Sequence, residues 1–231
     1  MHFYQSKTKK QIIYSIAILI LFLTYVVTFM ELAEEIQKAE LIKFDKNIIG
    51  YIQGFISEQL TVYMLAITYL GSYDWILIAV VLSSILLLAN KRVNLAVYLA
   101  MSSGLGAIFN KMLKKIFQRE RPDIFPVIRE HGFSFPSGHS MGAMVLYGTL
   151  AIIIIKIVNK KSYKAAAGFI AMLLILLIGV SRVYLGVHYP SDVVAGFAAG
   201  AAWLTLCRLA LLVYEYQRQK RLTLKAERIR T

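Results

Sequence analysis

The chain has 231 residues, of which 58% are hydrophobic and only 17% are charged, with a formal net charge of +13 and one cysteine. Soluble domains carry about 45–50% apolar and about 25% charged residues, so this composition excludes an ordinary water-soluble domain. It also excludes a disordered chain, and it excludes a disulfide-stabilised scaffold because Cys207 has no intrachain partner. The length suits one integral membrane domain without a second large soluble domain.

Six apolar stretches recur along the chain. The first has about 20 residues, enough to cross the hydrocarbon core, and the others need a few flanking residues. They are Gln11–Met30, Trp75–Ala89, Val93–Asn110, Ser140–Ile155, Ala165–Ser181 and Val193–Cys207. We therefore predict an all-α, polytopic membrane protein with six transmembrane helices. It forms a single domain over residues 1–231, with a core of about 11–212 and a basic tail at 213–231.

The first apolar stretch follows Lys7, Lys9 and Lys10, as the apolar part of a secretory signal peptide would. A signal peptide, however, has an apolar core of about 7–15 residues and a small-residue cleavage site. The stretch is longer than this and is followed by Glu31-Leu-Ala-Glu-Glu. We therefore expect an uncleaved membrane anchor.

The distribution of basic residues predicts the orientation in the membrane. With both termini in the cytoplasm, the inner segments hold 16 basic and two acidic residues, whereas the outer segments hold ten basic and eleven acidic residues. We expect a multi-pass protein of the cell membrane with both termini cytoplasmic. Its positive charge then sets the orientation in the membrane and attracts anionic lipid. No nucleic-acid partner is expected.

Two outer segments stand out. In Glu31–Leu60, apolar residues recur at spacings of three and four, which predicts amphipathic helices on the membrane surface between the first two spans. These helices form either a solvated connector with a packing face or a route for substrate recruitment, and the pattern leaves both open. Asp74 is predicted to cap the next helix.

The loop between the third and fourth spans breaks the charge rule, which an anionic ligand there would explain. Its basic residues are Lys111, Lys114, Lys115, Arg119, Arg121 and Arg129.

The first of three polar clusters on the outer face is Lys114-Lys-Ile-Phe-Gln-Arg-Glu-Arg121-Pro122. Lys114 and Arg121 are seven residues apart, or two helical turns, so they point the same way if the helix persists to Pro122. Such a pair suits a phosphate group, with arginine supplying a planar fork and lysine a point charge. Taken alone, the run is more typical of an interfacial anchor.

The second cluster is Phe135-Pro-Ser-Gly-His-Ser140. Ser137 is predicted to be a helix N-cap, and Gly138 allows the backbone to approach a ligand closely. Exposed N–H groups at such a helix start form an anion site. His139, in the first turn, can give a proton to a group bound there. Taken alone, this peptide indicates a helix cap with an interfacial histidine.

The third cluster is Ser181-Arg182-Val-Tyr-Leu-Gly-Val-His188-Tyr-Pro-Ser-Asp192. Asp192 follows His188 by four residues and can orient its ring, which leaves the other ring nitrogen free as a nucleophile. Pro190 favours the first turn of a helix, so His188 is expected at or just before the cap. The alternative for this segment is a structural ion pair between Arg182 and Asp192.

In this order and spacing, Lys114-x6-Arg121-Pro122, Pro136-Ser-Gly-His139 and Ser181-Arg182-x5-His188-x3-Asp192 resemble the three-part signature of the type-2 phosphatidic acid phosphatase superfamily. That superfamily includes lipid phosphate phosphatases, bacterial phosphatidylglycerophosphate and undecaprenyl-diphosphate phosphatases, and soluble vanadium haloperoxidases. The resemblance implies that His188 attacks phosphorus to form a phosphohistidine, that Asp192 orients it, and that His139 acts as acid and base. It also implies a phosphate site formed by Lys114, Arg121, Ser137, Gly138 and Arg182, without metal or cofactor. His131, Asp123 and Glu130 lie in the loop nearby, where they can shape the head-group pocket, although a loop histidine such as His131 is more typically solvated.

These features predict a membrane lipid phosphatase with an extracytoplasmic site that hydrolyses the terminal phosphate of a lipid phosphate or diphosphate. The signature recognises the phosphoryl group and not the lipid. It therefore does not distinguish among phosphatidylglycerophosphate, phosphatidate and undecaprenyl diphosphate as the substrate. The sequence does not determine the oligomeric state. The alternative is a lipid transporter or scramblase that retains the fold. It would place polar residues inside the spans, which contain almost none. The membrane spans disfavour a soluble haloperoxidase.

Overall fold

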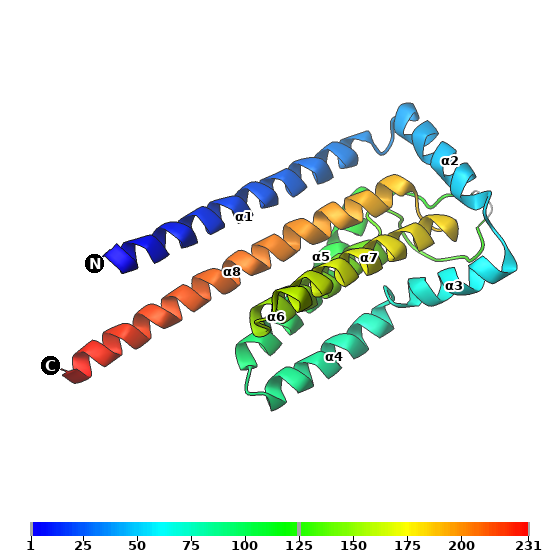
Figure 1. The fold of residues 1–231 in the computed structure, drawn as a ribbon. Coiled ribbons are helices and arrows are strands. Elements are labelled where there is room, and N and C mark those ends of the chain that lie inside the picture. Colours follow the sequence, from blue (N-terminus) through cyan, green and yellow to red (C-terminus); the bar gives the residue numbers. More distant parts are fainter. Residues whose placement is uncertain (1, 124–125, 231) are drawn as a thin grey trace.

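A computed structural model describes residues 2–123 and 126–230 of the chain. These residues form eight helices and no strand, which confirms the predicted all-α class. The helices are α1 (His2–Glu35), α2 (Ala39–Gln53), α3 (Glu58–Tyr69), α4 (Tyr73–Ala89), α5 (Val93–Phe117), α6 (Gly138–Ile157), α7 (Lys161–Tyr184) and α8 (Pro190–Arg230). In Figure 1 the long helices α1 and α8 pack side by side, both termini lie at one end, and α2 crosses the opposite end.

Within the described residues, five helices are long and apolar enough to cross a membrane, and α3 with α4, bent by 49°, gives a sixth span if the pair is counted as one. This agrees with the predicted multi-span architecture. Counted in this way, the second span is not Trp75–Ala89 alone, because it includes α3. The predicted surface segment Glu31–Leu60 consists of the end of α1, the whole of α2 and the first turn of α3. The part that forms a separate helix is α2.

A serine cap starts each half of the bent pair, and the cap at Ser72 lies at the break. The Oγ of Ser57 accepts the N–H of Leu60 and starts α3, and the Oγ of Ser72 accepts the N–H of Trp75 and starts α4. Asp74 therefore lies in the first turn of α4, and its predicted role as the cap is wrong.

The third span ends earlier than the sequence predicts. Gln118 adopts the left-handed conformation with φ 46°, and its N–H donates to the carbonyl of Lys114. The prediction that Lys114 and Arg121 share one helix face is therefore wrong. After the helix, the carbonyl of Arg119 accepts the N–H of Ser134 at 2.8 Å, so the segment with the two arginines runs beside the segment that leads into α6.

Close packing of α8 fixes the position of α6. A Cβ atom placed on Gly196 would lie 2.7 Å from the carbonyl oxygen of Ser137, and one on Gly200 would lie 2.9 Å from Cβ of Met144. Small residues permit this kind of close helix crossing in membranes. The crossing brings the start of α6 against the first turns of α8, where the second and third polar clusters meet.

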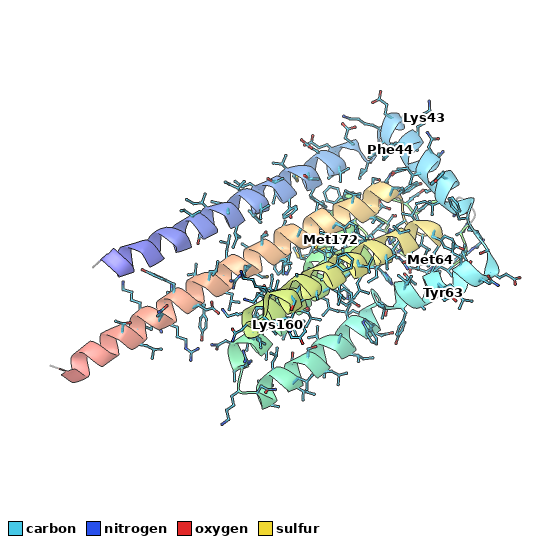
Figure 2. All side chains as sticks on the ribbon, viewed as in Figure 1. Lys43, Phe44, Tyr63, Met64, Lys160 and Met172 are labelled. Carbon is cyan, nitrogen blue, oxygen red and sulfur yellow. The ribbon has the colours of Figure 1, made fainter. Side chains whose placement is uncertain are left out.

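The outer surface of the bundle is apolar, as expected for a surface that faces lipid. Tyr63 is 67% exposed and Met172 is 64% exposed. In Figure 2, Lys43 on α2 and Lys160 at the start of α7 mark opposite ends of the bundle. The long connection between α5 and α6 lies at the α2 end, and it carries part of the polar clusters.

Candidate active site

The turn between α7 and α8 holds the predicted nucleophile and its carboxylate. Because α8 begins with Pro190, His188 lies just before the cap of that helix, as predicted. Its Nδ1 is 3.4 Å from Oδ2 of Asp192, and the two side chains are 1% and 0% exposed. The same oxygen accepts the N–H of Tyr189 at 2.9 Å, which fixes the carboxylate. Asp192 therefore holds His188 through Nδ1 and leaves Nε2 as the ring nitrogen that carries the lone pair.

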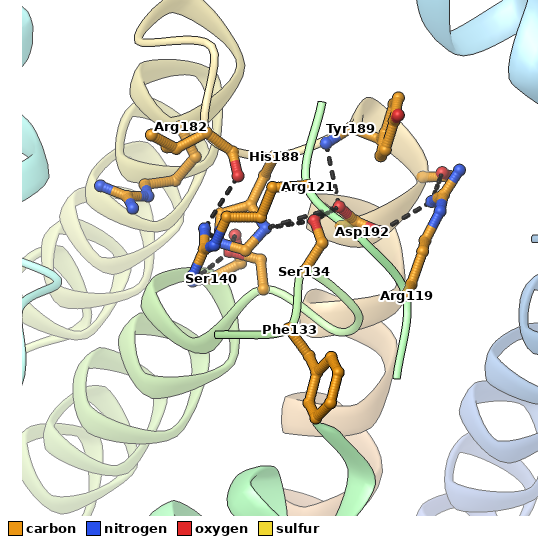
Figure 3. Close-up of polar contacts among 12 residues, drawn as sticks. Arg119, Arg121, Phe133, Ser134, Ser140, Arg182, His188, Tyr189 and Asp192 are labelled. Carbon is orange, nitrogen blue, oxygen red and sulfur yellow. Dashed lines mark hydrogen bonds and ion pairs between the residues drawn. The ribbon is translucent and has the colours of Figure 1, made fainter. Parts of the chain in front are cut away.

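Ser134 supports this pair from the connection that leads into α6. Its Oγ donates to Oδ2 of Asp192 and lies 3.2 Å from Nδ1 of His188. Burial removes water from the imidazole and lowers the pKa of His188 to about 4, although Asp192 opposes the shift. The ring is therefore neutral at pH 7 and keeps a lone pair. Its Nε2 lies 3.3 Å from Nη1 of Arg121 (Figure 3), which turns the lone pair toward a cationic cluster.

Two guanidinium groups converge on one carboxylate beside this nitrogen. Nη1 of Arg121 is 3.1 Å from Oε2 of Glu130, and Nη2 of Arg182 contacts the other oxygen of Glu130. Burial alone would raise the pKa of Glu130, but attraction by Arg182 and Arg121 outweighs it and lowers that pKa to about 2. Arg182 also donates through Nη1 to Thr68 at 2.7 Å, whereas its buried Nε has no partner among the described residues. Two guanidinium groups arranged in this way can also hold a phosphoryl group.

The start of α6 supplies the second predicted cluster. Ser137 is its N-cap, as predicted, and accepts the N–H of Ser140 at 3.4 Å. The N–H of Ser137 donates to the carbonyl of Asp192 at 3.0 Å and so joins the two helix starts. A Cβ atom on Gly138 would lie 3.1 Å from Oδ1 of Asn110, so a larger residue would crowd this approach.

Lys114 and His139 approach the same space from α5 and α6. The Nζ of Lys114 donates to the carbonyls of Phe133 at 2.6 Å and Ser134 at 3.2 Å. His139 is half-buried, and a Cβ atom on Gly71 would lie 3.3 Å from its Cβ and Cδ2. The ring of His139 interacts electrostatically with Arg182, Glu130, His188 and Arg121. The three clusters therefore form one site.

The structure brings together all eight residues that the sequence assigns to the site: Lys114, Arg121, Ser137, Gly138, His139, Arg182, His188 and Asp192. His131 is exposed, and only its carbonyl enters the site, where it accepts from Nη2 of Arg121 at 3.4 Å. The alternative ion pair between Arg182 and Asp192 does not form. Arg182 pairs with Glu130, and Asp192 instead accepts from Nη1 of Arg119 at 2.7 Å.

Sequence reasoning missed three contributors to the site. Arg119 stands in the same basic run as Arg121, and Ser134 stands three residues before Ser137, so both lie next to residues of the motifs. Asp45 carried no such signal. It lies on α2, is completely buried, and contacts Ser191, which is 146 residues away in the chain.

An apolar cleft of about 630 Å³ leads away from the site between α4, α5 and α6. Gly138, His139 and Lys111 lie on its wall, and the rest of its lining is mostly apolar, including Leu77 and Ile108. A cleft of this size and character can accommodate part of an apolar chain.

The polar donors of the site suit an anion. In the parts of the chain that the structure describes, no group of three or more His, Cys, Asp or Glu side chains is arranged to hold a metal ion. Each of the two carboxylates close to His188 is bonded to an arginine: Asp192 to Arg119 and Glu130 to Arg121. The remaining groups are mostly hydrogen-bond donors and positive charges, which bind oxyanions.

Comparison with known proteins agrees with this chemistry. Residues 95–216 match the profile of the PAP2 superfamily. The chain belongs to the PAP2 superfamily. It is 37% identical over 142 residues to phosphatidylglycerophosphatase B of Bacillus subtilis (strain 168), a match that covers 59% of this chain and 68% of that protein.

Two further matches place this PAP2 protein among membrane phosphatases. The crystal structure of the first transmembrane PAP2 type phosphatidylglycerolphosphate phosphatase from Bacillus subtilis superposes with a TM-score of 0.77 and 31% identity over 81% of this chain and 94% of that chain. The lipid A 1-phosphatase of Rhizobium johnstonii is 35% identical over 119 residues, which cover 47% of this chain and 44% of that protein. The protein is thus a multi-pass membrane phosphatase that hydrolyses phosphoric esters.

Proposed function

We propose that this PAP2 phosphatase removes the terminal phosphate of a lipid phosphate through a phosphohistidine at His188. The observation that carries the proposal is the buried, neutral imidazole, whose Nδ1 is held by Asp192 while its Nε2 faces Arg121 at 3.3 Å. A nucleophile needs an available lone pair, and this arrangement leaves it on the nitrogen beside the cationic cluster.

In the first step, Nε2 of His188 attacks phosphorus, an N–P bond forms and the ester P–O bond breaks. Protonated His139 gives its proton to the leaving lipid oxygen. Lys114, Arg121, Arg182 and the start of α6 stabilise the negative charge on the phosphoryl oxygens. Because Arg121 and Arg182 hold Glu130 in this structure, the phosphoryl group must exchange with that carboxylate.

The second step returns the enzyme to its starting state. The imidazole of His139, now neutral, takes a proton from water, and the resulting hydroxide attacks the phosphohistidine. The O–P bond forms, the N–P bond breaks and inorganic phosphate leaves. Asp192 stabilises the charge that develops on the His188 ring in both steps.

The apolar cleft beside His139 supports a lipid substrate. Each buried CH₂ contributes about 0.8 kcal/mol, so a chain held in the cleft adds binding energy that a soluble ester lacks. Part of that energy can position the phosphorus in front of His188 and so raise kcat. Phosphatidylglycerophosphate is the first substrate to test because a relative of that activity matches much of the chain. Phosphatidate and undecaprenyl diphosphate are the further candidates.

The orientation is part of the proposal: both termini are cytoplasmic, and the site faces the extracytoplasmic side. The excess of basic residues on the segments at the terminal end supports it. Both termini also lie at the end of the bundle opposite the site (Figure 1).

The test compares phosphate release from lipid phosphates with release from glycerol phosphate and p-nitrophenyl phosphate by purified protein. We expect a far higher kcat/KM for the lipids and loss of turnover in His188→Ala without loss of the folded protein. Similar efficiency on the soluble esters would contradict the lipid assignment. Near-normal activity of His188→Ala would contradict the mechanism.

The transporter alternative has no observation in its favour. Among the residues that the structure describes, the fully buried ionisable side chains are Asp45, Arg182, His188 and Asp192, and all four lie at the site end of the bundle rather than along a path through it. A transport route for charged lipid head groups would need ionisable side chains along a path through the spans, whereas the buried Ser102 and Thr149, which lie deeper, are neutral.

A further inference from the structure

A second buried carboxylate lies behind the nucleophile, outside the set of residues that carries the reaction. Asp45 on α2 is completely buried, although its neighbours Phe44 and Lys46 on the same helix are exposed. Its Oδ1 accepts the N–H of Ser191 at 2.9 Å, and its Oδ2 accepts the Oγ of Ser191 at 2.5 Å. Oδ2 also accepts Nη2 of Arg119 at 3.0 Å.

Arg119 therefore bridges two carboxylates. Its Nη1 donates to Oδ1 of Asp192 at 2.7 Å and to Oγ of Ser191 at 2.8 Å, while Nη2 is taken by Asp45. The guanidinium carbon lies 4.1 Å from the ring centre of Tyr189, and the side chain is only 8% exposed. In Figure 3, Arg119 and Arg121 stand on opposite sides of Asp192.

The two oxygens of Asp192 consequently have separate tasks. Oδ1 accepts from Arg119, whereas Oδ2 faces His188 and accepts from Ser134 and the N–H of Tyr189. A guanidinium group paired with a single carboxylate tends to bind both oxygens as a fork. An Arg119 side chain released from Asp45 would thus compete with His188 for Oδ2.

We propose that Asp45 is a positioning residue for the nucleophile: it holds one arm of Arg119 away from Asp192 and so reserves Oδ2 of Asp192 for His188. The inference deepens the proposed function and rests on His188 being the nucleophile. It also assigns a task to α2, which Asp45 connects to the catalytic turn. Asp45 touches neither substrate nor the reacting atoms, so its removal should act on kcat rather than on KM.

The test uses the full-length protein in detergent with a lipid phosphate substrate. Asp45→Asn keeps the size of the side chain and an acceptor for Ser191 but removes the charge that holds Arg119. Glu40→Gln is the matched control because Glu40 is exposed on the same helix. We expect Asp45→Asn to lower kcat about tenfold to hundredfold, the usual cost of losing a group that orients a catalytic residue. KM should stay within about twofold of wild type, as should all constants of Glu40→Gln.

A double-mutant cycle separates positioning from a general structural effect. If Asp45 acts through Asp192, adding Asp45→Asn to Asp192→Asn should cost less than about twofold in kcat. An equal loss in both backgrounds, or a kcat of Asp45→Asn within about twofold of wild type, would overturn the proposal.

A milder variant covers the case in which Asp45→Asn does not fold. Ser191→Ala removes one hydrogen bond to Asp45 and one to Arg119 without changing any charge. It should lower kcat about threefold to tenfold with an unchanged KM, and an unchanged kcat would overturn the proposal. Failure of the proposed function looks different, because wild type would then release no phosphate from lipids or His188→Ala would remain active.

Discussion

The crossing of α6 over α8 predicts a loss of activity from the smallest possible enlargement of one glycine. In Gly196→Ala, the new Cβ would lie 2.7 Å from the carbonyl oxygen of Ser137 and 2.9 Å from Cβ of Ser140, against about 3.4 Å for an ordinary contact. The start of α6 must therefore move by about 0.7 Å away from α8. That movement carries the helix amides and His139 away from His188.

A displacement of about 1 Å in a catalytic group costs on the order of a hundredfold in rate, so we expect Gly196→Ala to lower kcat about tenfold to hundredfold. The assay is phosphate release from a lipid phosphate, together with the thermal unfolding midpoint in detergent. Gly168→Ala on α7 is the matched control because a Cβ atom there meets nothing within 4 Å. It should keep its activity and gain slightly in stability. If Gly196→Ala is as active as Gly168→Ala, the reasoning about this crossing is refuted.

Three further predictions concern pH, inhibitors and topology. Since burial lowers the pKa of His188 to about 4, the acid limb that this group contributes to kcat/KM should lie near pH 4 rather than 6.5 once ionisation of the substrate is corrected for. The contribution of His188 to the free energy of unfolding is complete above pH 6.5 and is lost as the pH falls through 4. An acid limb of kcat/KM at pH 6.5 would contradict the burial argument. Vanadate should inhibit the enzyme. Glu130→Gln should bind vanadate more tightly, because the substitution releases the two arginines from the carboxylate. Loss of activity with EDTA that a divalent ion restores would contradict the metal-free scheme. In a Cys207→Ala background, cysteine at Val127 should react with an impermeant thiol reagent on intact cells and cysteine at Ser162 only after permeabilisation, whereas equal labelling would contradict the orientation.

Local chemistry made part of the site predictable. Ser137 as an N-cap and His188 just before a helix that begins with Pro190 follow from rules that act over a few residues, and the structure agrees with both. The convergence of the three motifs was predictable for a different reason, because consecutive membrane spans alternate direction and place these motifs at one end of the bundle.

Other features depend on tertiary contacts that no sequence period encodes. The end of α5 at Phe117 follows from the left-handed Gln118, a residue type without a strong preference for that conformation. The break between α3 and α4 places Gly71 against Ile178, where a Cβ would lie 2.6 Å from Cγ2. Asp45 is an ordinary acidic residue of an amphipathic helix until its partners from distant parts of the chain enclose it.

The length of α8 has a consequence for the bilayer that hosts the protein. This one uninterrupted helix begins two residues before Asp192 and runs through Arg218, Lys220 and Arg221. At about 1.5 Å per residue, the distance from Asp192 to Arg218 is about 39 Å, close to the thickness of a whole bilayer of about 40–45 Å with its head groups. In the proposed orientation, anionic lipids at the cytoplasmic surface hold the basic end, so the helix sets the height of the catalytic carboxylate above the opposite surface. We therefore expect turnover in reconstituted vesicles to pass through a maximum as the acyl chains are lengthened, because thinner and thicker bilayers both move the lipid phosphate away from His188.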